Sequence, residues 1–190
     1  MTKSTEASIE RDLRSALNSY KDSATAVKAA DRAARQAIKD DPRTSDLAKR
    51  ELLEALGHET KGKLVALKGE QESYVQGLRQ KIEREFRGSQ PSDAASVVSR
   101  RDAMARARKI TDKHEALEVL QDAIATGDAD LAHAVGARAR NTSMFDVAEL
   151  YQASYPETAD SAAALAYVEA NTSGAAYNVS NSITFSAPSD

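Results

Sequence analysis

Apolar side chains recur at intervals of three and four residues near the start of the chain. They occupy the positions Leu13, Leu17, Tyr20, Ala24, Val27, Ala34 and Ile38. The alternating steps are those of the a and d positions of a coiled coil. Residues 5–40 contain neither glycine nor proline and are rich in alanine, so this stretch predicts one long helix. Asp31 occupies a seam position and interrupts the apolar pattern.

A second long helix is predicted over about residues 45–87. Pro42 ends the first helix, because the residue before a proline avoids the α region. The apolar stripe of the second helix is Leu53, Leu56, Leu64, Leu67, Val75, Leu78, Ile82 and Phe86. Four glycines interrupt it, and each costs about 1 kcal/mol relative to alanine. We therefore expect a continuous helix with a weak point near Gly57 or Gly62, antiparallel to the first.

A clear boundary follows at residues 88–92, where a glycine and Pro91 stop any helix and serine or aspartate can cap the next. A third helix is predicted over about residues 94–109. It is basic and carries Arg100, Arg101, Arg106, Arg108 and Lys109. Because no aromatic side chains are interleaved with these cations, we expect a solvated face or an acidic protein partner, not nucleic acid.

Short helices are predicted from residue 111 onward. Asp112 begins one with capping-box spacing, Gly127 ends it, and Asp128 caps the next. Ser143 has the spacing to cap a third. The helix pairs that start near Asp112 and Ser143 are about 31 residues apart, close to the 34 of a tetratricopeptide repeat. The consensus of that repeat is not reproduced, so we expect a repeat-like, tetratricopeptide-like helical domain over 111–174.

The C-terminal stretch has a different period. Tyr177, Val179, Ile183 and Phe185 alternate with small or polar residues, as in a strand. We expect residues 175–190 to form an extended tail that docks on another protein, with a flexible joint before it. The alternative is a disordered terminus.

Composition indicates a thin core and therefore protein partners. Hydrophobic residues make up 41 % of the chain, but only 5 % are aromatic and tryptophan is absent. The seam of the first helix could be covered within the chain, but we expect another chain to complete it, in an oligomer or a larger assembly. The predicted interaction residues are Leu13, Leu17, Tyr20, Val27, Ile38, Tyr177, Val179, Ile183 and Phe185.

The chemistry of the sequence gives no catalytic, cofactor-binding or metal-binding candidates. Cysteine is absent, and His58, His114 and His133 are isolated from one another. Phosphate loops and nucleophile elbows are missing. We therefore expect a protein that is not an enzyme, binds no cofactor or metal, and lacks both a secretion signal and a membrane span.

Charge divides the chain into two unequal parts. Residues 1–110 carry 23 basic and 17 acidic side chains, whereas residues 111–190 carry 3 and 12. The acidic C-terminal part disfavours nucleic acid there.

Short motifs spread over most of the chain carry a family resemblance. They are Asp41-Pro42-Arg43, Glu85-Phe86-Arg87-Gly88, Arg101-Asp102-Ala103, Glu115-Ala116-Leu117, Ala125-Thr126-Gly127-Asp128 with Leu131-Ala132, and Asp146-Val147 followed by Tyr151 and Pro156. Taken together, they resemble uncharacterised structural-region proteins of tailed phages and prophages of actinobacteria. Those proteins have a coiled helical N-terminal half, a repeat-like helical half and an extended tail. The glycine usual before the Asp-Val pair is replaced here by Asn141 or Ser143.

The sequence thus predicts an all-α protein with four parts. These are a long helical hairpin (1–88), a linker with a basic helix (89–110), the repeat-like domain (111–174) and the extended tail (175–190). The resemblance implies a virion or assembly role for a capsid, connector or scaffold component that contacts capsid, portal or its own copies, in the virion or the host cytoplasm. The alternative is a cytoplasmic adaptor whose acidic repeat-like domain binds a basic peptide or protein.

Overall fold

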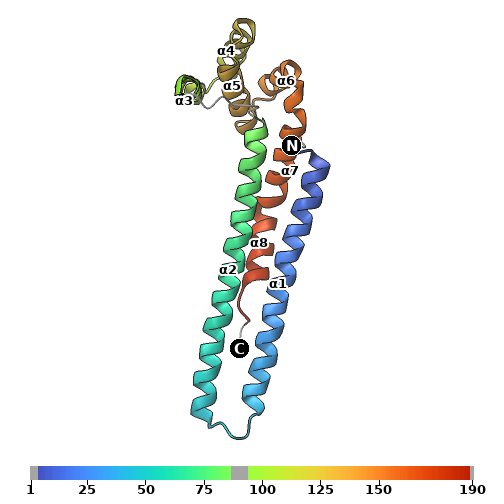
Figure 1. Cartoon of the computed structure of the whole chain (residues 1–190), viewed down its shortest axis with the longest axis vertical. Helices are drawn as coiled ribbons and strands as arrows, with labels where there is room; N and C mark the ends of the chain where they lie inside the picture. The colour runs from blue at the N-terminus through green and yellow to red at the C-terminus, as the bar shows by residue number, and fades with distance from the viewer. Residues whose placement is uncertain (1–3, 87–93, 189–190) are drawn as a thin grey trace. The chain divides into compact units, whose positions relative to one another are not determined.

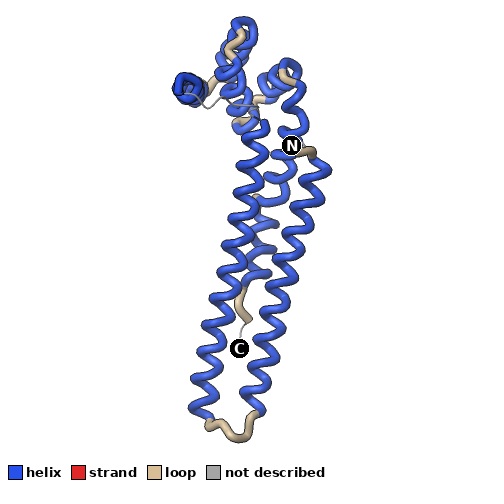
Figure 2. Tube along the Cα trace, in the orientation of Figure 1, coloured by secondary structure: helices blue, strands red, loops and turns tan. Residues whose placement is uncertain are grey.

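The computed structural model describes residues 4–86 and 94–188, and all regular structure in these ranges is helical (Figures 1 and 2). The long helices are α1 (Glu6–Asp40) and α2 (Asp46–Phe86). The shorter elements are α3 (Ala94–Lys109), α4 (Lys113–Thr126), α5 (Ala129–Asn141), α6 (Phe145–Ser154), the 3-10 turn η1 (Pro156–Thr158), α7 (Ala159–Thr172) and α8 (Gly174–Phe185). The predicted all-α fold with two long leading helices is confirmed.

The chain divides into two compact units. Unit 1 combines Lys81–Ala163 with the N-terminal residues up to Thr5. Unit 2 combines Glu6–Gln80 with the chain from Ala164 onward. The predicted boundary at 88–92 lies outside the described residues, and the four sequence-based domain ranges stay predictions.

Unit 2 is built on the hairpin of α1 and α2. The turn between them is held by Asp41, whose carboxylate accepts hydrogen bonds from the Arg43 amide (2.9 Å) and the Thr44 hydroxyl (2.6 Å). The Ser45 hydroxyl then accepts from the Ala48 amide in the first turn of α2 (3.3 Å), as an N-cap does. The proline at position 42 and this local network together end α1 and begin α2.

The second helix is continuous, so the predicted weak point at Gly57 or Gly62 does not break it. Gly62 is exposed, with open space where a Cβ would lie. Buried Thr60, Leu64 and Gln71 lie on the opposite face, at the four- and seven-residue spacing of a coiled-coil seam. Packing of that face maintains the helix, because propensity alone is a weak determinant of helix structure.

The C-terminal stretch is helical, so the prediction of an extended tail is wrong. Tyr177 and Asn181 in α8 both accept hydrogen bonds from the Gln71 side-chain amide on α2, at 3.0 and 3.3 Å. Phe185 is buried against Ala24 and Leu64, one from each hairpin helix. These contacts follow helical spacing of four residues, and they place α8 along both helices of the hairpin (Figure 1).

Unit 1 contains α3 to α6, with α5 packed against α3, α4 and α6. The predicted caps at Asp112 and Asp128 are confirmed, since each carboxylate accepts amide hydrogen bonds at the start of its helix. Gly127 ends α4 at φ 73°, as predicted for a C′ glycine.

The predicted cap at Ser143 is wrong. Ser143 has φ 58° and occupies the left-handed position after α5, where glycine is usual. The Met144 amide donates back to the Ala139 carbonyl at 2.9 Å, which is the longer-range hydrogen bond of a Schellman motif. Helix α6 then begins after Met144 without a side-chain cap.

Candidate functional site

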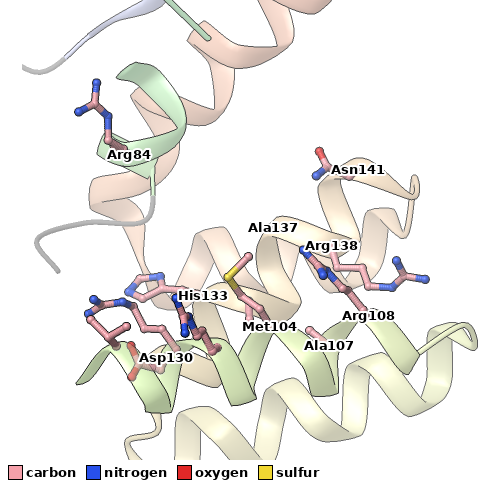
Figure 3. A pocket seen from close by; sticks show the side chains of 13 residues that line it. Arg84, Met104, Ala107, Arg108, Asp130, His133, Ala137, Arg138 and Asn141 are labelled. Carbon is pink, nitrogen blue, oxygen red and sulfur yellow. The ribbon is translucent and has the colours of Figure 1, made fainter. Parts of the chain in front are cut away.

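A cavity of about 680 Å³ lies in unit 1 between one face of α3 and the facing residues of α5 (Figure 3). The α3 residues on its wall are Val97, Arg100, Arg101, Met104, Ala107 and Arg108. From α5 come Asp130, His133, Ala134, Ala137, Arg138 and Asn141, and the last turn of α2 contributes Arg84. The spacing of three and four residues on both helices shows that one face of each is turned to the cavity.

The wall of the cavity is strongly cationic. Among the described residues, five guanidinium groups line it, against the single carboxylate of Asp130. The Arg138 guanidinium is held in place, because its Nε donates to the Ile110 carbonyl at 2.7 Å. A planar guanidinium binds carboxylate and phosphate through two parallel hydrogen bonds, so this lining suits an anionic ligand.

The centre of the cavity is apolar. Met104 extends from α3 into the space between His133 and Arg138 in Figure 3. The flexible side chain of a methionine adapts to irregular apolar groups. A ligand that fits both features is an acidic segment with apolar side chains of its own, such as a peptide.

An aromatic cluster supports the α5 side of the site. The Tyr151 ring lies 5.6 Å from the Phe86 ring and 5.2 Å from the Tyr155 ring, measured between centroids. His133 Nδ1 is hydrogen-bonded to the Tyr151 hydroxyl, which fixes the imidazole that lines the cavity. Burial lowers the pKa of His133, against the opposing effect of Glu157 and Asp130. Burial also disfavours the charged form of Tyr151 and therefore raises the pKa of its hydroxyl.

Close packing of α5 on this cluster depends on Gly136. A methyl group at that position would overlap the ring of Tyr151. The glycine therefore lets the aromatic ring lie directly against the α5 backbone. His133 lies one helical turn before Gly136, so the same close packing of α5 on Tyr151 also places the His133 ring.

The predicted interaction residues of α1 face the interior of unit 2. Leu13 is buried, and Leu17, Tyr20, Val27 and Ile38 are half-buried. Tyr20 and Val27 pack on a cluster formed by Ala24, Leu64 and Phe185. The chain's own helices thus cover the middle of the seam, as in the intramolecular alternative. Whether another chain adds to this seam stays a prediction.

The predicted interaction residues of the tail divide into two groups. Tyr177 is half-buried and Phe185 is buried, both toward the hairpin. Val179 and Ile183 point outward, with 58 % and 67 % of their surface exposed. A strand would place all four side chains on one face, but the helix turns Val179 and Ile183 away from Tyr177 and Phe185.

The cavity itself was not predicted as a site. The basic character of α3 was recognised from the sequence, and three of its cations do line the cavity, whereas Arg106 and Lys109 do not. The convergence of Arg84 and Arg138 depends on packing between distant segments. The three- and four-residue spacing of Arg101, Met104 and Arg108 was the local signal for a shared face.

The described residues include no group of three or more histidine, aspartate or glutamate side chains arranged to hold a metal ion. None of the described helices combines the length and apolar character needed to cross a membrane. No protein-family model matches the chain, and no curated protein or solved structure is significantly similar to it.

Proposed function

We propose that this chain is a non-enzymatic structural or assembly protein of a tailed-phage virion, either a minor capsid or connector-region component or a scaffold. It acts by binding other protein chains. The family resemblance of its helix-turn motifs supports the phage context. The cationic cavity between α3 and α5 supports the mode of action and is the observation on which the proposal depends.

The cavity favours an acidic protein segment as the ligand. Five guanidinium groups surround an apolar centre, and apart from His133 the described part of the chain places no aromatic ring on the wall. Single-stranded nucleic acid is usually bound on stacking aromatic platforms, so the lining fits a peptide better than a base. The same charge disfavours a basic peptide at this site, which was the ligand of the adaptor alternative.

Mass spectrometry of purified particles tests the assembly role. Particles and empty precursor shells should be purified from the bacterium that encodes the chain, after induction of its phage or prophage. We expect the chain in mature particles if it is a retained component, and in precursor shells alone if it is a scaffold. Its absence from both would overturn the proposal.

A matched pair of variants links the cavity to that role. Arg101→Glu with Arg108→Glu reverses two cavity cations, and Arg106→Glu with Lys109→Glu reverses two cations on α3 that do not line the cavity. We expect the first variant to fail to incorporate into particles and the second to incorporate normally. Equal incorporation of both would show that the cavity is not the binding site.

A further inference from the structure

A groove separate from the unit 1 cavity lies in unit 2, on the part of the hairpin beyond the end of α8. It has a volume of about 550 Å³ and is lined by Arg35, Lys39, Arg50, Leu53, Glu54, Gly57, His58, Lys61 and Pro188. Pro188, three residues after the end of α8, lies at its margin. The groove is therefore the continuation of the surface on which α8 lies (Figure 1).

The α8 segment shows how this surface binds a helix. Phe185 inserts between Ala24 of α1 and Leu64 of α2, so α8 rests on both helices of the hairpin. The Lys28 ammonium donates to the Ile183 carbonyl at 2.8 Å, near the C-terminal end of α8. A third helix is thus accommodated as far as Phe185, and the same two helices continue beyond it.

The floor of the groove is held by a buried ionic cluster. Arg35 Nε donates to Asp31 at 2.8 Å, with 14 % and 0 % of the two side chains exposed. Thr60 on α2 donates to the other oxygen of the same carboxylate. Gly57 leaves room for the guanidinium, since a Cβ there would lie 3.2 Å from Arg35 Nη2. A half-buried leucine, Leu53, adds an apolar contact on the same wall.

The rim of the groove is cationic. Lys39, Arg50 and Lys61 lie on it and are exposed. None of the three forms an ion pair with another described residue. The rim carboxylate of Glu54 lies 3.9 Å from His58 Nε2, and among the described residues that line the groove it is the only acidic side chain. This surplus of positive charge is complementary to an acidic partner.

We propose that an acidic amphipathic helix of a partner protein docks in this groove, end to end with α8. It would complete the third position of the coiled-coil-like bundle toward the hairpin turn. Its apolar residues would contact Leu53 and the seam, and its carboxylates would pair with Lys39, Arg50 and Lys61. This inference concerns a different surface from the cavity in unit 1.

Fluorescence anisotropy with the full chain tests the proposal. The probe is a fluorescein-labelled peptide of roughly 15 residues, about the shortest length that holds a helix in water, with leucine at a and d and glutamate elsewhere. We expect binding that weakens as salt is raised. Lys39→Glu with Lys61→Glu should weaken it by roughly tenfold or more.

Three controls make the result decisive. Lys21→Glu with Lys68→Glu reverses one exposed lysine on each hairpin helix outside the groove and should bind like the unmodified chain. The unit 1 cavity is also proposed to take an acidic segment, so the same titration is made with Arg101→Glu and Arg108→Glu together, a variant that removes binding there and should retain binding in the groove. The inference is overturned if the peptide does not bind, if the cavity variant alone loses binding, or if a peptide with lysine in place of glutamate binds equally well.

Discussion

The hydroxyl of Thr60 donates a 2.8 Å hydrogen bond to the buried carboxylate of Asp31, from one helix of the hairpin to the other. Arg35 holds the second carboxylate oxygen. The polar residue that interrupts the seam in the sequence is therefore satisfied by two partners. A polar group at a seam position is a known means of specifying the register of a coiled coil.

Replacing Asp31 with alanine should destabilise unit 2 by about 3 kcal/mol, because it removes the buried carboxylate that pairs with Arg35. Replacing Thr60 with valine should cost about 1 kcal/mol, the usual net value of one hydrogen bond. Urea unfolding followed by circular dichroism would measure both. A larger effect of the Thr60 change would contradict this account.

Two glycine-to-alanine substitutions should have opposite effects. Gly62→Ala places a methyl group in open space on an exposed helix position and should stabilise the hairpin by about 1 kcal/mol. Gly136→Ala would overlap the Tyr151 ring and should destabilise unit 1 by about 1–3 kcal/mol. Thermal unfolding of the two variants beside the unmodified chain would show the difference in sign.

Ser143→Gly should stabilise unit 1 by about 1 kcal/mol, since a residue with a Cβ is disfavoured at the left-handed φ of 58°. Ser143→Ala serves as the control, because it removes the hydroxyl and keeps the Cβ. It should bring no comparable gain. If the alanine variant were as stable as the glycine variant, backbone conformation would not be the cause.

The stability of unit 1 should fall as the pH is lowered from 7 to 5. Burial lowers the pKa of His133 in the folded chain, whereas in the unfolded chain the pKa is about 6.5. The unfolded state therefore binds more protons below about pH 6.5, and the stabilisation present above that value is lost as the pH falls toward the folded pKa. Chemical denaturation at several pH values measures this dependence.

The control for that experiment is a pair of histidine variants. His133→Gln should flatten the dependence on pH, and His58→Gln, at an exposed position of the hairpin, should leave it unchanged. An unchanged slope in the His133 variant would assign the dependence to other groups.

Phe185→Ala should destabilise unit 2 by about 3 kcal/mol, because the ring is buried between Ala24 and Leu64. The matched change Ile183→Ala, on the exposed side of α8, should have an effect below about 0.5 kcal/mol. Thermal unfolding would compare them. Equal effects would indicate that α8 does not pack on the hairpin through Phe185.

The hairpin could be predicted from the sequence because its signals are local and repeated. Leu13 and the residues that follow at steps of three and four mark the buried face, and the proline at position 42 marks the turn. The glycines of α2 led to one wrong expectation, a weak point in the helix that the structure does not have. Their cost is spread along a helix whose other face is packed, so tertiary contacts outweigh propensity.

The form of the C-terminal segment could not be predicted in the same way. Tyr177 and Phe185 fit an alternating pattern, but they also lie eight residues apart, on one face of a helix together with Asn181. The choice between strand and helix depends on Gln71 of α2, whose side-chain amide donates hydrogen bonds to both Tyr177 and Asn181. No pattern within the C-terminal segment indicates this contact. The cationic cavity was hidden for a related reason, since Arg84 and Arg138 come to line one cavity only after the chain has folded.

The place of α8 in unit 2 has a consequence for biosynthesis. The hairpin surface on which it lies is complete once α2 has been made, yet Phe185 is synthesised about 100 residues later. At the usual rate of 5–20 residues per second, that interval lasts roughly 5–20 s. During this time Ala24 and Leu64 are not yet covered by α8, and the seam of the nascent hairpin is open to a helix of another protein. Timing of synthesis therefore gives any early-binding partner a period of several seconds before the chain can cover this surface with its own last helix.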